Sequence, residues 1–239
     1  MEEIIKVEHL YKSYNGNSVV HDVSIHVNRG MVFGLLGANG AGKSTTIECI
    51  LGTRIADKGD ISILGLNPLT ERKILFERVG VQFQEGNYQE RITVMELCEV
   101  TNSLYKETLS FMDLLKDFGI IDKLKSPVSE LSGGQRQRLF IVLALIPNPE
   151  VVFLDELTTG LDTKARRDVW KILLRLKERG LTIFLTSHYM DEVEVLCDEI
   201  MILKKGNVVF HGTVEEAIKS SPYDKLEDAY LWYSGEEDK

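Results

Sequence analysis

The 239-residue sequence has no long apolar run, no signal-peptide pattern and no excess of positive charge. No stretch approaches the roughly 20 apolar residues that a membrane-spanning helix needs. The Met-Glu-Glu start also lacks the basic and apolar regions of a secretory signal. We therefore expect the chain itself to be soluble and cytoplasmic, so that another protein must hold it at any membrane where it works.

The excess of acidic over basic residues and the small number of cysteines exclude further classes of function. A net charge of -9, spread along the chain, argues against a nucleic-acid surface or an electrostatic membrane anchor. Cys49, Cys98 and Cys197 are isolated, with no metal-ligand spacing or disulfide framework, so we predict reduced thiols. We find no internal repeat. The length suits one large α/β domain or two small lobes.

A glycine-rich motif, Gly-Ala-Asn-Gly-Ala-Gly-Lys-Ser-Thr, occupies residues 37–45. It fits the pattern G-x-x-x-x-G-K-[ST], which binds phosphate groups when it joins a strand to a helix. Residues 31–36 form an apolar run typical of a buried strand, and residues 45–51 can continue as a helix. This context favours a phosphate loop over a glycine-rich turn without a ligand.

Each residue type in this loop has a chemical reason to be there. Glycines let backbone N–H groups approach phosphate closely, and the helix N-terminus adds about half a positive charge. Lys43 would reach the β- and γ-phosphates, and Ser44 would place a hydroxyl on Mg²⁺. The predicted contacts to ATP are Gly37, Ala38, Asn39, Gly40, Ala41, Gly42, Lys43, Ser44 and Thr45.

Two carboxylates follow a second apolar stretch, at residues 151–154. The stretch predicts a buried parallel strand, and ligands of such sheets lie at the carboxyl ends of the strands. We then expect Asp155 to be the Mg²⁺ partner, directly or through water, and Glu156 to be the general base that polarises the attacking water. An Asp-Glu pair after a strand is more often a helix cap, but the phosphate loop upstream favours catalysis.

A histidine follows a third apolar stretch, at residues 181–186. A lone histidine after a strand is usually an ordinary loop residue. His188, however, would reach the same sheet edge as the phosphate loop, which predicts a sensor of the γ-phosphate. His9, His21, His26 and His211 have no such placement.

The sequence Leu131-Ser132-Gly133-Gly134-Gln135 precedes a helical pattern of apolar residues. Ser132 can cap that helix, but two glycines in a first turn are poor helix formers and indicate a surface that another group approaches closely. The motif resembles the signature of the ATP-binding cassette family, the nucleotide-binding subunits of ABC transporters. The resemblance covers essentially the whole chain, and the other motifs recur in the family's order.

The resemblance implies roles for three further residues. Tyr14 matches the aromatic residue that stacks on adenine, although by itself it would be taken for a strand residue. Gln84 matches the glutamine that contacts Mg²⁺ and the attacking water, with Gln82 close enough to confuse the assignment. Asp162, in Gly160-Leu161-Asp162, matches the loop that lies across the family's dimer interface.

The resemblance also implies a head-to-tail pair of chains, either a homodimer or a heterodimer. ATP bound to residues 37–45 of one chain would be covered by Ser132, Gly133, Gly134, Gln135 and Asp162 of the partner. One departure is visible, because Leu157 stands where the family usually has proline. Leucine keeps a backbone N–H and more freedom, so we expect little effect on ATP binding and an effect on the geometry of Glu156.

The predicted fold class is α/β: a P-loop NTPase core of the RecA-like type, with an N-terminal antiparallel β subdomain and an inserted α-helical subdomain. Residues 1–84 and 150–215 would form the core with its β subdomain, residues 85–149 the helical subdomain, and residues 216–239 a C-terminal helix and an acidic tail. The alternation near the start predicts short antiparallel strands, with turns at Asn15-Gly16 and at residues 28–30. Together these parts make a single ATP-binding domain.

Several local patterns predict helices. Phe111, Leu114, Leu115 and Phe118 recur at helical spacing before Gly119, and Val169, Ile172, Leu173 and Leu176 do so before Gly180. Thr213 with Glu216 predicts a capping box for a last helix.

We expect residues 86–94 to form part of the contact with a membrane partner, the alternative being an ordinary solvated loop.

Three functions remain to be weighed. The leading one is the ATPase subunit of a transporter that resembles multidrug or small-molecule exporters. It would use ATP and Mg²⁺, with a transmembrane permease on a separate chain, on the cytoplasmic face of the membrane. The second is a soluble ATPase of the same superfamily acting on ribosomes or DNA, which the single cassette and the lack of a coiled coil disfavour. A P-loop nucleotide kinase or regulatory module would leave residues 131–135 unexplained.

Overall fold

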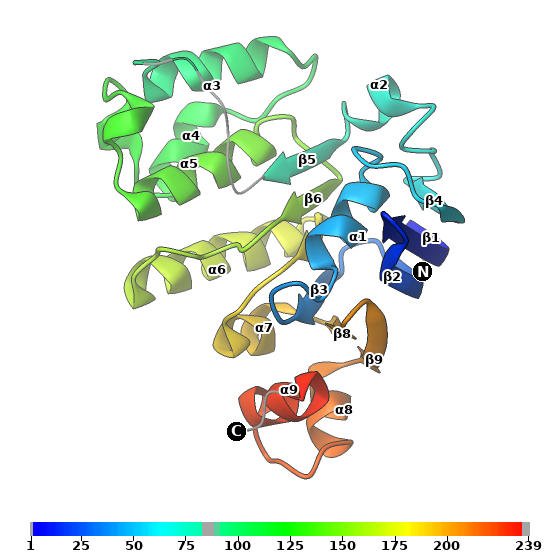
Figure 1. Ribbon diagram of the computed structural model, residues 1–239. Helices are drawn as coiled ribbons and strands as arrows, with labels where there is room; N and C mark the ends of the chain where they lie inside the picture. Colours follow the sequence, from blue (N-terminus) through cyan, green and yellow to red (C-terminus); the bar gives the residue numbers. More distant parts are fainter. Residues whose placement is uncertain (1, 83–88, 90, 236–239) are drawn as a thin grey trace. The chain divides into compact units, whose positions relative to one another are not determined.

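The computed structural model describes residues 2–82, 89 and 91–235 (Figure 1). The chain forms two compact units, the first made of residues 1–75 and 184–239 and the second of residues 76–183. The chain returns to the first unit within strand β7 (Thr182–Leu185). Among the described residues, no helix has both the length and the apolar character needed to span a bilayer.

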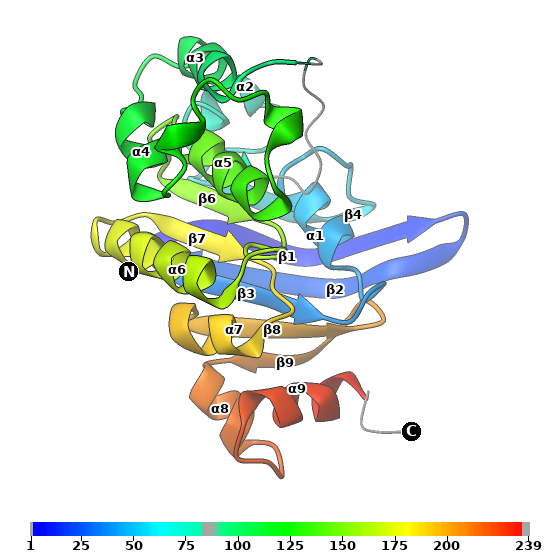
Figure 2. The same cartoon turned by 90° about the vertical axis from the view of Figure 1, so that its left-hand side faces the viewer.

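The first unit begins with a long antiparallel hairpin (Figure 2). Strands β1 (Glu3–Tyr14) and β2 (Asn17–Asn28) are joined at Asn15 and Gly16, which both adopt positive φ angles, as a two-residue hairpin turn requires. Strand β4 (Lys58–Ile63) pairs with the other edge of β1, so the sheet order is β2-β1-β4.

The prediction that these strands are short was wrong, since each runs for 12 residues. The reason is local. His9 and Asp22 have positive φ angles, and the register between the strands shifts near His9. Such bulges break the two-residue alternation of buried side chains, which hides the length of a strand from its sequence pattern. Strand β4 was not predicted.

A second group of strands in this unit carries the start of the phosphate loop. Strand β3 (Val32–Gly37) pairs in parallel with β8 (Glu199–Lys204), which pairs antiparallel with β9 (Asn207–Gly212). All six residues of β3 are buried, as expected of a strand covered on both faces. Helix α1 (Lys43–Ile50) follows the loop, and the short α2 (Arg72–Leu75) closes this part of the chain.

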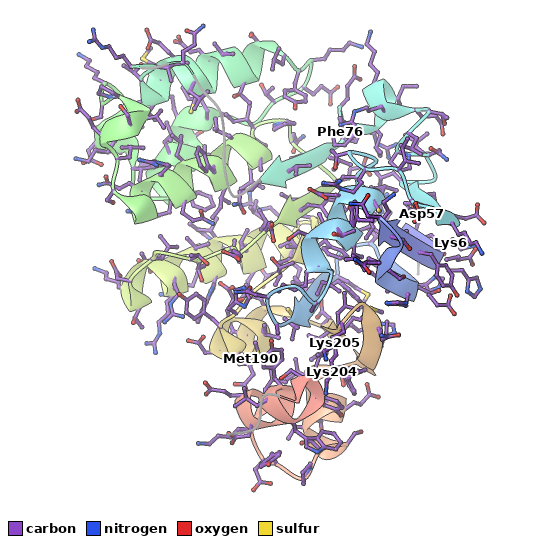
Figure 3. All side chains as sticks on the ribbon, in the orientation of Figure 1. Lys6, Asp57, Phe76, Met190, Lys204 and Lys205 are labelled. Atoms are coloured by element: carbon purple, nitrogen blue, oxygen red, sulfur yellow. The ribbon has the colours of Figure 1, made fainter. Side chains whose placement is uncertain are left out.

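The C-terminal part of the first unit packs on these strands. Helices α7 (Met190–Leu196), α8 (Val214–Lys219) and α9 (Leu226–Ser234) contribute to a buried cluster with β3 and β8. Met190, which Figure 3 labels, belongs to that cluster together with Leu36, Val193, Ile200, Ile202, Ala217 and Leu226. The capping box of Thr213 and Glu216 is confirmed, but two helices follow it where one was predicted.

The second unit combines two parallel strands with a group of helices, drawn mainly in green in Figure 1. Strand β5 (Val79–Gln82) pairs with β6 (Val151–Leu154). Helices α3 (Val94–Ser103), α4 (Phe111–Asp117) and α5 (Gly133–Leu145) form the helical part, and α6 (Thr163–Glu178) follows β6. The predicted helices at residues 111–118 and 169–176 are confirmed.

The three cysteines are free thiols, as predicted. Cys49 and Cys98 are buried, whereas Cys197 is partly exposed. Burial raises the pKa of Cys49 to about 11 and that of Cys98 to about 12, because a thiolate loses its hydration in an apolar surrounding. Both thiols are therefore unreactive core residues at neutral pH.

Candidate functional site

The glycine-rich loop connects β3 to α1 in the first unit, as the motif predicts. Gly37, Gly40 and Gly42 all have positive φ angles. A Cβ atom on Gly37 would lie 2.5 Å from the backbone oxygen of Leu203 and 2.9 Å from the Cβ of Ala41, so only glycine fits there. Helix α1 has no side-chain cap, which leaves its first N–H groups for a ligand.

The loop buries its lysine and exposes three of its other residues. The Nζ of Lys43 donates to the carbonyl oxygens of Gly37, at 2.6 Å, and Ala38, at 3.2 Å, and the residue is buried. Asn39, Gly40 and Ser44 are exposed. The loop thus presents backbone N–H groups and a hydroxyl to a ligand around a fixed positive charge, which is the chemistry that a polyphosphate requires.

Tyr14 ends strand β1 in the same unit, next to two cationic side chains. The Nζ of Lys12 lies 5.4 Å from the centre of the Tyr14 ring, and the Cζ of Arg54 lies 5.2 Å from it. Arg54 is also paired with Glu48 on α1, and Lys12 with Asp57. These cation–π contacts help to hold the ring in place, and Tyr14 is partly exposed.

His188 lies in the first unit, three residues after the end of β7. The preceding residue, Ser187, is buried, and its Oγ accepts a hydrogen bond of 3.0 Å from the N–H of Tyr189. His188 itself is exposed. The residue predicted to sense the γ-phosphate is therefore accessible to solvent, beside a turn that a hydrogen bond holds.

The carboxylates of the second unit stand at the end of β6, as predicted. Strand β6 is completely buried, whereas Asp155 and Glu156 are partly exposed. The side-chain amide of Gln82, at the end of the neighbouring strand, donates to the Asp155 carbonyl at 3.2 Å. Gln82 therefore has a structural role here, whereas Gln84 lies outside the described residues.

Glu156 has an unusual backbone, with a φ angle of 50°. This left-handed conformation costs a non-glycine residue about 1–2 kcal/mol, so neighbouring groups must hold it. Gln137 on α5 donates its amide to the carbonyl oxygens of Glu156, at 3.0 Å, and Leu157, at 2.9 Å. Leu157 is fully buried. Sequence reasoning missed Gln137, since no pattern relates it to Glu156.

The signature residues begin helix α5 in the same unit. Ser132 caps the helix as predicted, and Gln135 completes a capping box by accepting from the Ser132 N–H at 3.0 Å. A Cβ atom on Gly134 would lie 3.0 Å from the carbonyl oxygen of Gly160, so the helix start packs against the loop that follows Glu156. Ser132 and Gly133 are exposed.

Asp162 has a local role that sequence reasoning missed. Its side chain accepts a hydrogen bond of 2.9 Å from the N–H of Ala165 and caps α6. Asp162 stands directly before Thr163, the first residue of α6, and Asp is a favoured residue at this capping position. The carboxylate is therefore already engaged in its own chain, which fixes where the loop ends and the helix begins.

The predicted site residues thus fall into two sets. The first unit contains Tyr14, residues 37–45 and His188. The second unit contains Asp155, Glu156, residues 132–135 and Asp162.

Within the part of the chain that the structure describes, no three His, Cys, Asp or Glu side chains gather to hold a metal. A hydroxyl such as that of Ser44 and a carboxylate such as that of Asp155 are the oxygen ligands that Mg²⁺ takes alongside phosphates and water.

Comparison with known proteins shows which family has this phosphate loop, these carboxylates and this signature motif. The family model described as "ABC transporter" matches residues 20–159, more than half of the chain. The chain belongs to the ABC transporter family. This ABC protein is an ATP-binding subunit, an ATPase whose hydrolysis of ATP is coupled to transport through a membrane partner.

Curated relatives of this ABC subunit include two described as Nod factor export ATP-binding protein I. The protein of Rhizobium etli is 38% identical over 212 residues, which cover 87% of this chain and 67% of the relative. The protein of Paraburkholderia xenovorans is 38% identical over 225 residues, which cover 92% of this chain and 74% of the relative.

A solved structure described as the ATP-binding subunit of an ABC transporter superposes with a TM-score of 0.88 at 27% identity, covering 97% of this chain and 99% of that one. Another, the ADP conformation of an ATP-binding cassette, has a TM-score of 0.79 at 27% identity, with the same coverage. The predicted fold class, an α/β P-loop NTPase with a β subdomain and a helical insertion, is confirmed. The predicted division of the ABC subunit into residue ranges stays a prediction.

Proposed function

We propose that this ABC subunit drives the export of a small molecule through a separate transmembrane permease, on the cytoplasmic face of the membrane. The observation that favours export over import is the 38% identity, over most of the chain, to proteins that are named for export. The names of these relatives and of the solved structures favour transport over action on ribosomes or DNA. A nucleotide kinase would leave residues 131–135 without a purpose.

In this proposal, the loop at residues 37–45 holds the phosphates of ATP, and Tyr14 stacks on the adenine. The buried ammonium of Lys43 neutralises charge on the β- and γ-phosphates. Ser44 and Asp155 would hold Mg²⁺, which would supply further positive charge to the phosphates. The predicted Gln84 would contribute to this set.

Hydrolysis then requires a base and a sensor. Glu156 takes a proton from water as the water oxygen bonds to the γ-phosphorus and the bond to the β–γ bridging oxygen breaks. His188 hydrogen-bonds the γ-phosphate.

Residues 132–135 and Asp162 cover the ATP of a second chain, in a homodimer or heterodimer. The exposed Ser132 and Gly133 support this part of the proposal.

The experiment that tests the proposal is copurification. The tagged chain is expressed in its native cell, membranes are solubilised in detergent, and bound proteins are identified by mass, with untagged cells as the control. We expect a polytopic membrane protein, and that protein should raise the ATPase rate when the two are reconstituted in vesicles. Recovery of only ribosomal, DNA-bound or soluble partners would overturn the transport function while leaving the ATPase chemistry intact.

A further inference from the structure

We infer that Gln137 is a positioning residue for Glu156, an inference that rests on the proposed role of Glu156 as the base. Its side-chain amide fixes the left-handed turn from which the Glu156 carboxylate projects. Gln137 is a residue of helix α5, outside the five signature positions, and it is not among the residues predicted to bind ATP or Mg²⁺. Its effect on hydrolysis would therefore pass entirely through the backbone of the loop.

The hydrogen bonds are specific to an amide donor. The Nε2 of Gln137 lies 3.0 Å from the Glu156 oxygen and 2.9 Å from the Leu157 oxygen. An amide nitrogen has two hydrogens, so one side chain satisfies both contacts. Both partners are carbonyl oxygens, which accept only, so the opposite orientation of the amide would place oxygen against oxygen.

The turn needs such a restraint because of its own sequence. Glu156 has a φ angle of 50°, which few residues other than glycine adopt. Proline at the next position would fix one more backbone angle, whereas Leu157 leaves it free to rotate. The two bonds from Gln137 hold the carbonyls on either side of the Leu157 N–Cα bond, and they therefore restrain the angle that a proline ring would have fixed.

The helix that carries Gln137 is itself firmly held. The capping box of Ser132 and Gln135 fixes the start of α5, and Leu139, Ile141 and Val142 are fully buried. Gly134 packs against Gly160 of the same loop, which gives the helix a second contact beyond Glu156. A group placed on a rigid, packed helix can hold a catalytic loop more precisely than another loop residue could.

The test compares steady-state ATP hydrolysis by Gln137→Met with the wild type, in the presence of the membrane partner if the basal rate is low. Methionine has similar length and cannot donate a hydrogen bond. We expect kcat to fall about 10- to 100-fold, since a small misplacement of a reacting group costs up to about 100-fold. The KM for ATP and the melting temperature should change little.

A matched control removes a side-chain hydrogen bond elsewhere in the same unit. The Oγ1 of Thr101 donates to the Leu97 carbonyl at 2.9 Å within α3, and Thr101→Val deletes that bond while keeping the volume. We expect kcat of this variant to stay at the wild-type value. Gln137→Leu serves as a second variant if Gln137→Met does not fold.

A double-mutant cycle with Glu156→Gln shows whether Gln137 acts through Glu156. If it does, Gln137→Met causes no further loss in the Glu156→Gln background. An equal further loss there, or a Gln137→Met variant with wild-type kcat beside an inactive Glu156→Gln, would overturn the inference and leave the base intact. Wild-type turnover by Glu156→Gln alone would instead refute the proposed role of Glu156.

Discussion

The ammonium group of Lys43 donates a 2.6 Å hydrogen bond to the carbonyl oxygen of Gly37, the last residue of β3. The two residues stand at opposite ends of the phosphate loop. The bond therefore closes the loop on itself and keeps a long, flexible side chain in one place. A charge that is positioned in advance need not be ordered when a phosphate binds.

The first prediction concerns this lysine. Lys43→Ala should weaken ATP binding about 10- to 100-fold, since hydrogen bonds to charged groups contribute about 1.5–3 kcal/mol. Equilibrium titration with ATP measures the effect. Lys171→Ala, which removes an exposed lysine of α6, is the control and should bind ATP normally. Unchanged affinity in Lys43→Ala would contradict the role given to this residue.

The second prediction concerns the base. Glu156→Gln keeps the size of the side chain but cannot take a proton from water, so ATP turnover should fall by roughly 10² to 10⁴. ATP binding should persist, because Lys43 and the loop are unchanged. Phosphate release measures turnover, and equilibrium titration measures binding. A variant that hydrolyses ATP at the wild-type rate would show that another group is the base.

The third prediction concerns the exposed start of α5. Ser132→Arg places a long cation where the second chain's ATP is proposed to bind, so ATP-dependent pairing should be lost. Sizing chromatography in the Glu156→Gln background, which preserves the nucleotide, measures the pairing. Ser132→Thr keeps a hydroxyl that can cap α5 and is the control. An intact ATP-dependent dimer of Ser132→Arg would argue against a shared site.

The fourth prediction concerns pH and the capping box of α3. The Oε2 of Glu96 accepts from the N–H and the hydroxyl of Thr93, both at 2.8 Å, and these bonds lower the pKa of Glu96 below its ordinary 4.5. A folded-state pKa below the unfolded one stabilises the fold above the unfolded pKa, and this contribution is lost as the pH falls through the folded pKa.

Glu96→Gln should therefore lower the melting temperature at neutral pH, where the wild-type residue is a carboxylate. The difference from wild type should shrink as the pH falls and vanish once Glu96 is protonated. Thermal melts at several pH values measure the trend. Glu99→Gln, an exposed change of the same charge on the same helix, is the control. A difference that is independent of pH would contradict the assignment.

Motifs whose chemistry depends on neighbouring residues could be predicted from the sequence. The phosphate loop, the caps at Ser132 and Thr213 and the strand before Asp155 follow from local preferences over a few positions. The length of β1 and β2 could not be predicted, because bulges at His9 and Asp22 break the alternation. The roles of the individual site residues stay predictions.

By itself the sequence determined the family and predicted the chemistry, because the glycine spacing, Lys43 and the motif at residues 131–135 are local patterns that can be recognised without a structure. Only the tertiary structure decided what holds those groups in place. Gln137 and Glu156 are 19 residues apart, and their hydrogen bond exists because α5 packs beside the loop after β6. Contacts between distant segments depend on how helices and strands pack, which no local pattern of residues records.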